Sequence, residues 1–299
     1  MQATDRTALA SAALGITAVG AGIAVSSRLT GYPVLTAQAV RYGLAAVILG
    51  LAARRRGRRE PRGPAADWAR IVTVAATGMA LFNVAVVRAV SSGEPAVVAT
   101  VIGCAPVVFA LVVPALEHRR PSARVVGGAC FVAAGAAVVE GFGRADAAAL
   151  AWSAVALACE VGFTVVAVPV LRTISPLGLS LRACAVAAVL LALASPVLEG
   201  PGALRAPSVD ELLALGYLAV VSTVVAFLLW YSAVRRLGPE TAGLLCGLMP
   251  VAAAVVGAAL TPAAFRWQIL AGTCLVAGGL ALAVARSRLP TAEPAGVPG

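Results

Sequence analysis

Charged residues are scarce in this chain. They make up 12% of its 299 residues, whereas 61% are hydrophobic and the mean hydropathy is +0.95. In soluble domains, about a quarter of the residues are charged. So few polar side chains cannot cover a soluble globule of this length, and the lipid bilayer must therefore surround most of the chain.

Lysine is absent, and all 23 basic residues are arginine, which gives a formal net charge of +10. Many of these arginines lie in short segments between apolar stretches, above all in the run from Arg54 to Arg62. This distribution is typical of the positive-inside bias of membrane proteins and argues against nucleic acid as a partner. It predicts a multi-pass membrane protein with both the N- and C-termini in the cytoplasm and an even number of spans.

The residues that enzymes use are also missing. His118 is the single histidine, and the six cysteines lie in different apolar segments without a C-x-x-C pair. The sequence has no nucleotide-binding glycine loop, no zinc-protease motif and no nucleophile elbow. We therefore expect no enzymatic activity, no metal and no cofactor. A membrane enzyme acting on lipids would need His, Asp or Ser gathered at one membrane face, and no such cluster is found.

What the sequence does have is an internal repeat. The stretch Gly128-Ala-Cys-Phe-Val-Ala-Ala-Gly135 returns as Gly272-Thr-Cys-Leu-Val-Ala-Gly-Gly279, with five of eight positions identical at a shift of 144 residues. Pro106 meets Pro250 at the same shift. This pattern indicates duplication and fusion of one half, a common architecture of secondary transporters.

The apolar stretches predict an all-α integral membrane protein of about ten transmembrane helices. Each stretch reaches the roughly 20 residues that a bilayer core requires. The expected spans are 8–27, 33–53, 69–90, 96–116, 122–141, 147–168, 177–198, 211–233, 241–261 and 267–286.

Five spans per half is an odd number, so the second half must enter the membrane upside down relative to the first. The result is a pair of inverted repeats, which can open a central cavity to one side and then to the other. We expect the first repeat at 1–143, the second at 144–287 and a disordered cytoplasmic tail at 288–299.

Short motifs recur in order along both halves. The first half carries Arg41, Ala85-Val-Val-Arg88, Ala105-Pro106-Val107 and Glu117, and the second carries Arg182, Tyr231-Ser-Ala-Val-Arg-Arg236, Met249-Pro250-Val251 and Gln268-Ile-Leu-Ala-Gly272. In these motifs the chain resembles, over nearly its whole length, the EamA family of the drug/metabolite transporter superfamily. Thr261 stands where the shift would place a second copy of Glu117. The resemblance implies two EamA-like repeats in an inner-membrane secondary transporter. Its members mostly export metabolites, amino acids or toxic compounds, and some import them.

Glu160 is the first candidate for chemistry because it lies near the middle of the span 147–168. An acid at the bilayer centre costs roughly 2.5 to 3.5 kcal/mol on insertion scales, and such residues are usually functional. Burial favours the neutral carboxyl group, and a group that gains and loses a proton is what proton coupling requires. We predict that Glu160 handles protons or substrate. The alternative is a structural glutamate that stays protonated or hydrogen-bonded.

Four other side chains are predicted to contact substrate: Gln38, Arg41, Asn83 and Trp152. Gln38 and Asn83 are costly in lipid, so they either join helices or line a cavity. Trp152 precedes Glu160 by eight residues and lies on roughly the same helix face. Arg41 either faces the cavity as a carboxylate contact or extends to the headgroups.

Other residues receive a structural or gating interpretation. We expect Arg182 to extend to the headgroups, and Trp230 and Tyr231 to form part of an interfacial aromatic belt. Pro106 and Pro250 lie inside their spans and are either hinges or packing kinks. Glu117 follows the fourth span and is interpreted as a gate or as the partner of a helix-end ion pair.

These observations together favour a secondary exporter of small metabolites, amino acids or drugs that works by alternating access with proton exchange. Its expected partners are the small-molecule substrate, the lipid bilayer and protons, and a homodimer is possible but not required. The alternatives are an uncoupled facilitator or importer of the same fold, and a structural or regulatory membrane protein without transport activity.

Overall fold

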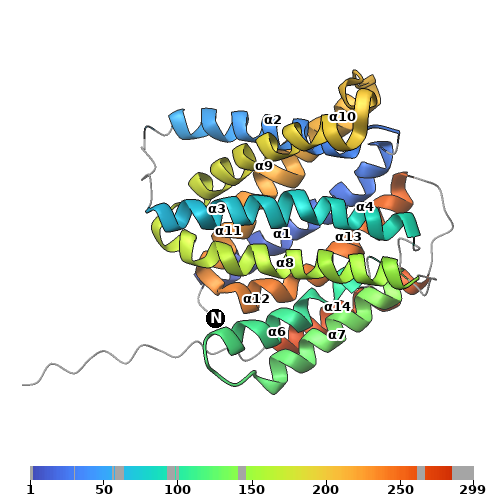
Figure 1. Cartoon of the computed structure of the whole chain (residues 1–299). Helices are drawn as coiled ribbons and strands as arrows, with labels where there is room; N and C mark the ends of the chain where they lie inside the picture. The colour runs from blue at the N-terminus through green and yellow to red at the C-terminus, as the bar shows by residue number, and fades with distance from the viewer. Residues whose placement is uncertain are drawn as a thin grey trace, which may run out of the picture.

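The computed structural model describes residues 3–29, 31–55, 57, 64–92, 98, 101–140, 146–260 and 267–284. Every regular element in these residues is helical (Figure 1). The expected tail at 288–299 and Thr261 lie outside the described residues, as does the expected domain boundary between 143 and 144.

The helices of the two halves follow the predicted spans closely. The first half contains α1 (Ala3–Ser26), α2 (Val34–Arg55), α3 (Ala65–Ala75), η2 (Ala76–Leu81), α4 (Phe82–Ser92), α6 (Ala105–Leu116) and α7 (Ala123–Glu140). The second contains α8 (Ala147–Thr173), α9 (Pro176–Glu199), α10 (Val209–Ala219), η4 (Val220–Val225), α11 (Ala226–Leu237), α12 (Pro239–Leu244), η5 (Leu245–Gly247), α13 (Leu248–Leu260) and α14 (Trp267–Val284). Among the described residues, seven helical segments are long and apolar enough to cross a membrane, and three shorter apolar helices accompany them. The all-helical membrane fold of about ten spans is confirmed.

The 144-residue shift of the sequence also relates the helices. Adding 144 to the bounds of α7 gives those of α14, and adding it to the bounds of α3 gives those of α10. The same shift carries η2 onto η4, and both of these segments are π-helical. Single π-helical turns are rare and often lie at functional sites. The duplication thus extends to an unusual backbone geometry at the same place in each half.

The repeated glycine motif forms the contact between α7 and α14. A Cβ added at Gly128 would lie 2.7 Å from the carbonyl oxygen of Gly279, and one added at Gly135 would lie 2.7 Å from that of Gly272. Residue numbers rise along one helix as they fall along the other, so the two helices run antiparallel. Small residues permit such a close approach of helix backbones in a membrane. Equivalent helices that pack antiparallel are what an inverted repeat produces.

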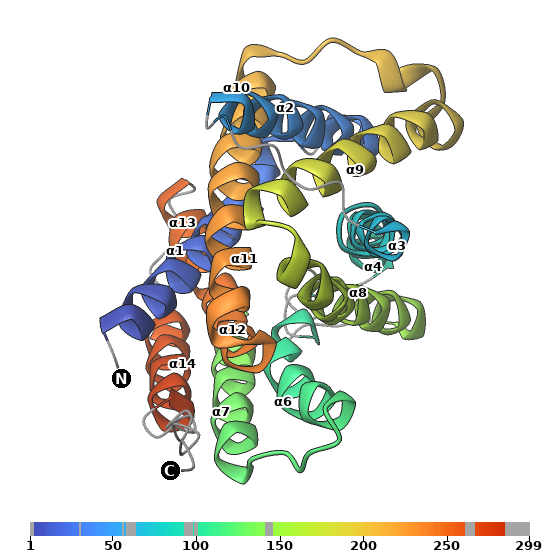
Figure 2. The same ribbon diagram turned by 90° about the vertical axis from the view of Figure 1, so that its left-hand side faces the viewer.

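The pair α2 and α9 repeats this arrangement. A Cβ at Gly43 would lie 3.9 Å from Ala188, and one at Gly50 would lie 3.7 Å from Leu181, so these equivalent helices also run antiparallel. Figure 2 shows α11 in the middle of the assembly, where it packs against α1, α8 and α9. A buried core drawn from both halves surrounds it.

Helix ends are set by local capping. Asp146 accepts a hydrogen bond from the backbone N–H of Ala149 at the start of α8, and Ser208 and Glu211 form a capping box at the start of α10. Such caps satisfy N–H groups that a helix start leaves without partners. Gly238 ends α11 with a φ of 79°, which a residue without a Cβ adopts at little cost. These caps fix where the spans begin, and hence the depth of the polar side chains within them.

Candidate functional site

Glu160 is the central residue of α8, about 20 Å from either end of this helix at about 1.5 Å per residue. Its side chain is buried, with 8% of the residue exposed. No residue that the structure describes gives it an ion pair or a hydrogen bond. The Glu160 carboxyl group lies within electrostatic range of Tyr42, Tyr231 and Cys246, which belong to α2, α11 and η5.

Two buried hydroxyl groups accompany this carboxyl group. Thr164 lies one turn after Glu160 on α8, and Tyr231 of α11 lies within electrostatic range of Glu160. Both residues are fully buried, and neither hydroxyl group has a hydrogen-bond partner among the described residues. A buried polar group without a partner costs about 1–3 kcal/mol, so such groups are rare away from functional sites. We name Tyr42, Glu160, Thr164, Tyr231 and Cys246 the central polar cluster.

The aromatic side chains around Tyr231 fix the position of its hydroxyl group. The ring of Phe163 lies 6.5 Å from that of Tyr231 and the ring of Phe227 lies 5.9 Å from it, both in edge-on geometry. Edge-on pairs of this kind are the favoured arrangement of aromatic rings. The expectation that Trp230 and Tyr231 form an interfacial belt is wrong, because both residues are buried, at 4% and 0% exposed. Helix α11 has protein neighbours on several sides, and a belt requires a lipid-facing helix.

Arg41 reaches from α2 to the π-helical segment η4 of the second half. Its Nε donates to the Thr223 hydroxyl group at 2.7 Å and its Nη2 to the Ser222 carbonyl oxygen at 3.3 Å. Its Nη1 donates to Gln38 Oε1, also at 3.3 Å. The guanidinium group therefore points across the interface between the two halves. Gln38, one turn earlier on α2, is buried beside it.

The other two predicted contact residues lie apart from this pair. The Asn83 amide donates to the Met79 carbonyl oxygen of η2 and lies beside the Tyr42 hydroxyl group. Trp152 is half-buried on α8, about 12 Å along the helix from Glu160. The Arg41 guanidinium group lies 5.2 Å from the Tyr42 ring centre, so the structure brings Gln38, Arg41 and Asn83 next to the central polar cluster. Substrate contact by any of the four, Trp152 included, stays a prediction.

The prolines of the fourth and ninth spans begin helices instead of interrupting them. Pro106 lies in the first turn of α6, directly after a break at Cys104, and Pro250 lies in the first turn of α13, after η5. A proline in the first turn removes no intrahelical hydrogen bond. This position differs from the interior one that the sequence suggested. Both spans are broken at equivalent places, and a hinge role for the two prolines stays a prediction.

Glu117 ends α6 and belongs to a bridge between the two halves. Arg119 Nε donates to Glu117 Oε2 at 2.6 Å, and Arg119 Nη2 donates to Glu240 in the first turn of α12. These hydrogen bonds raise the pKa of the Arg119 guanidinium group above its ordinary value. We call these three residues the Arg119 bridge. The Arg119 and Glu117 side chains are 42% and 55% exposed, so the ion pair between them adds little to stability.

A second set of contacts closes the opposite end of the bundle. Glu199, at the end of α9, accepts hydrogen bonds from the backbone N–H groups of Leu35 at 2.6 Å and Thr36 at 3.1 Å, at the start of α2. Arg205 Nη2 donates to the Gly31 carbonyl oxygen at 3.2 Å. These contacts join the loop after α9 to the loop before α2, and so again join the two halves.

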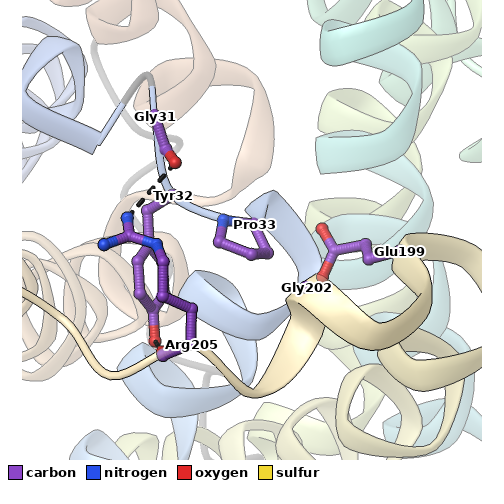
Figure 3. Close-up of a pocket in the computed structure, with 6 residues that line it drawn as sticks. All are labelled: Gly31, Tyr32, Pro33, Glu199, Gly202 and Arg205. Atoms are coloured by element: carbon purple, nitrogen blue, oxygen red, sulfur yellow. Dashed lines mark hydrogen bonds between the residues drawn. The ribbon is translucent and has the colours of Figure 1, made fainter.

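Figure 3 shows how this end is arranged around a shallow depression of about 400 Å³. The Arg205 guanidinium group lies 4.8 Å from the Tyr32 ring centre, and the Tyr32 hydroxyl group donates to the Arg205 carbonyl oxygen at 3.0 Å. We call Tyr32, Glu199 and Arg205 the Arg205 latch. The sequence did not predict this latch. The pattern Ser208-x-x-Glu211 indicates only that a helix starts just after it.

Comparisons with known proteins agree with this architecture. The model of the EamA-like transporter family matches residues 6–140 and 147–285. The chain belongs to the EamA-like transporter family. It is therefore a multi-pass membrane transporter with two EamA domains.

Two individual proteins are similar to the chain. An uncharacterized transporter, YetK, of Bacillus subtilis (strain 168) is 32% identical over 79 residues, which span 26% of this chain and 24% of that protein. A solved structure described only as a crystal structure of protein superposes with a TM-score of 0.79 at 21% identity. That match covers 93% of this chain and 98% of the other, and it shows the shared fold.

Proposed function

We propose that this EamA-family transporter exports small metabolites, amino acids or drugs in exchange for protons. The observation that carries the proposal is Glu160, an acid at the centre of α8 that no described residue neutralises. An ionised carboxylate at this depth is costly, so it favours either a proton or a bound substrate. If Glu160 binds either a proton or a substrate molecule but not both at once, the movements of protons and substrate across the membrane are coupled.

The inverted halves supply the conformational change that such a cycle needs. Equivalent helices meet antiparallel at α2–α9 and at α7–α14, so the two halves can exchange conformations by rocking. In this proposal the Arg119 bridge closes one face of the protein and the Arg205 latch closes the other. Both involve solvent-accessible arginines, and alternating access requires that each face close and open in turn.

The arginine distribution orients the cycle. With both termini in the cytoplasm, the Arg119 bridge lies on the cytoplasmic side and the Arg205 latch on the outer side. Substrate then enters the central polar cluster while the Arg119 bridge is open. It leaves on the outer side once the Arg205 latch has opened.

Substrate uptake into inverted vesicles under an imposed pH gradient tests this proposal, because an exporter moves substrate inward when the membrane is inverted. Inverted vesicles carrying the native chain, Glu160→Gln or Asp210→Asn would be compared over a panel of amino acids, metabolites and cationic drugs. Asp210 is an exposed acid in the first turn of α10 and serves as the matched control. We expect gradient-dependent flux that Glu160→Gln abolishes and Asp210→Asn retains.

Other results would favour the alternatives. Equal flux in all three proteins without dependence on the gradient indicates an uncoupled facilitator, and flux in the opposite direction indicates an importer. If Glu160→Gln changes only the stability of the protein and no compound moves, a structural or regulatory role replaces transport.

A further inference from the structure

The arginines of this protein differ in what neutralises them. Three that lie near helix ends each pair with a carboxylate: Arg70 with Asp67, Arg119 with Glu117 and Glu240, and Arg205 with Glu211. Arg41 lies deeper, about 10 Å along α2 from its first residue. Its hydrogen-bond acceptors are a hydroxyl, an amide and a carbonyl oxygen, and no carboxylate of the described residues lies within 4 Å of it.

This difference runs against the energetics of the membrane. A cation is screened by water at a helix end, whereas deep in a span it is expensive unless an anion compensates it. Three arginines near water have carboxylate partners, whereas Arg41, deep in its span, has none among the described residues. The cation–π contact of Arg41 with the Tyr42 ring supplies no negative charge. Arg41 therefore has no counter-charge from the described residues beside the central polar cluster.

The donors around this charge are only partly used. A guanidinium group has five N–H donors, and the contacts of Arg41 use one on each of its three nitrogens. Gln38 spends its Oε1 on Arg41, and no described residue accepts from its NH₂ group, although the residue is only 8% exposed. Gln38 and Arg41 stand three residues apart on α2 and so share one face of the helix. They present unused N–H donors and one positive charge at the same place.

We propose that Gln38 and Arg41 form a subsite for a carboxylate group of the transported molecule. The inference rests on the proposed transport function and names a chemical class for the substrate. A carboxylate is planar and accepts several N–H hydrogen bonds, and an arginine fork matches this geometry. It would also supply the negative charge that no described residue places within 4 Å of Arg41.

The π-helical segment η4 holds the guanidinium group ready for such a ligand. Thr223 and Ser222 accept from Nε and Nη2, which fixes the plane of the group without neutralising it. A donor set that is already oriented loses less entropy when a ligand binds. The contact to η4 therefore positions Arg41 and leaves its charge for the ligand.

The second half has no copy of this subsite. The 144-residue shift takes Gln38 to Arg182 and Arg41 to Ala185. The Arg182 guanidinium group lies 5.2 Å from the ring centre of Trp68, near the start of α3. Its surroundings therefore differ from those of Arg41, which contacts η4. One chain would therefore bind one carboxylate in this way.

Ligand-dependent thermal unfolding of the full-length protein in lipid nanodiscs tests the proposal. The probes are pairs that match in shape but differ in charge: benzoate with benzamide, acetate with acetamide, and lactate with lactamide, at an ionic strength held constant with sodium chloride. Inorganic phosphate and sulfate test other oxyanions. We expect at least one carboxylate to raise the unfolding midpoint saturably, while its amide does not.

Two variants separate ligand binding from a structural role of Arg41. Arg41→Gln should weaken binding of the carboxylate tenfold or more. Thr223→Val removes an acceptor that holds Arg41 but keeps the charge, and it should change the affinity only a few-fold. The proposal is overturned if amides protect as well as carboxylates, if no carboxylate protects, or if Arg41→Gln binds as tightly as the native chain. Preference for phosphate or sulfate over every carboxylate would also overturn it.

The Glu160→Gln variant separates this proposal from the transport mechanism. It should lose proton-coupled flux and still bind the carboxylate through Arg41. Proton-coupled flux without any carboxylate binding would sink the subsite alone. If the protein binds a carboxylate but its flux does not depend on the pH gradient, only the proposal of proton exchange is overturned.

Discussion

The contact between α7 and α14 makes a sharp prediction about Gly135→Ala. A Cβ at this position would lie 2.7 Å from the Gly272 carbonyl oxygen and 2.8 Å from Val276. Non-bonded carbon contacts are favourable only at about 3.5–4.0 Å, so the two helix backbones must separate by several tenths of an ångström. Two of the contacts are with backbone atoms, the Gly272 carbonyl oxygen and the Val276 nitrogen, and side-chain repacking cannot relieve them.

The magnitude follows from two opposing effects. Overpacking a close contact costs about 1–3 kcal/mol. Replacing a glycine by alanine inside a helix stabilises the helix by about 0.5–1 kcal/mol. We therefore expect Gly135→Ala to lower the free energy of unfolding by about 1–2 kcal/mol.

Gly127→Ala and Gly278→Ala are matched controls, one on each of the two helices. A Cβ at Gly127 or Gly278 meets nothing within 4 Å. These two variants gain the helix-propensity benefit without the clash and should be as stable as the native chain or slightly more stable. The assay is equilibrium unfolding of the purified protein by sodium dodecyl sulfate in mixed micelles. If Gly135→Ala proves as stable as Gly127→Ala, the antiparallel contact of equivalent helices described above is incorrect.

Three further substitutions test the cluster and the two ends of the bundle. Tyr231→Phe removes a buried hydroxyl group that has no described partner, so stability should be unchanged or higher by up to about 1–3 kcal/mol while flux falls; a clear loss of stability would contradict this. Arg119→Gln should alter stability by less than about 1 kcal/mol, because the Arg119 bridge is exposed. It should nevertheless speed labelling of Cys246 by a membrane-impermeant maleimide added on the Arg119 side, and an unchanged rate would remove the bridge from gating. Glu199→Gln weakens the acceptor of two backbone N–H groups at the start of α2 and should cost about 1 kcal/mol in thermal unfolding; no change would show that the capping contact contributes nothing.

Much of the fold could be predicted because hydropathy and parity depend only on the sequence. Apolar runs of membrane length mark the spans, and an odd number of spans per half requires inversion. The repeated glycine motif indicated the duplication. That its two copies touch each other, with Gly128 against Gly279 and Gly135 against Gly272, could not be predicted, because a match between segments says nothing about their distance in space.

The site was only partly predictable for a similar reason. The sequence reports how deep a residue lies in its span, but not whether its helix faces lipid or protein. The prediction that Tyr231 belongs to an interfacial belt is wrong for this reason, since α11 lies in the middle of the bundle. Glu160 and Arg41 could be found because charges within apolar spans are conspicuous. The contact of Arg41 with Thr223 requires a π-helical turn in the other half, and no sequence pattern marked that turn.

The most direct test of alternating access between inverted halves is a pair of distance measurements in one protein. Spin labels at His118 and Arg236 report on the face with the Arg119 bridge, and labels at Gly31 and Ala206 report on the face with the Arg205 latch, in a cysteine-free chain that retains transport. Double electron–electron resonance spectroscopy in nanodiscs would measure both distances between pH 5 and pH 8, in the native chain and in Glu160→Gln. We expect that one distance lengthens as the other shortens, and that Glu160→Gln keeps one arrangement at every pH. Two distances that rise and fall together, or that respond to pH equally in Glu160→Gln, would contradict it.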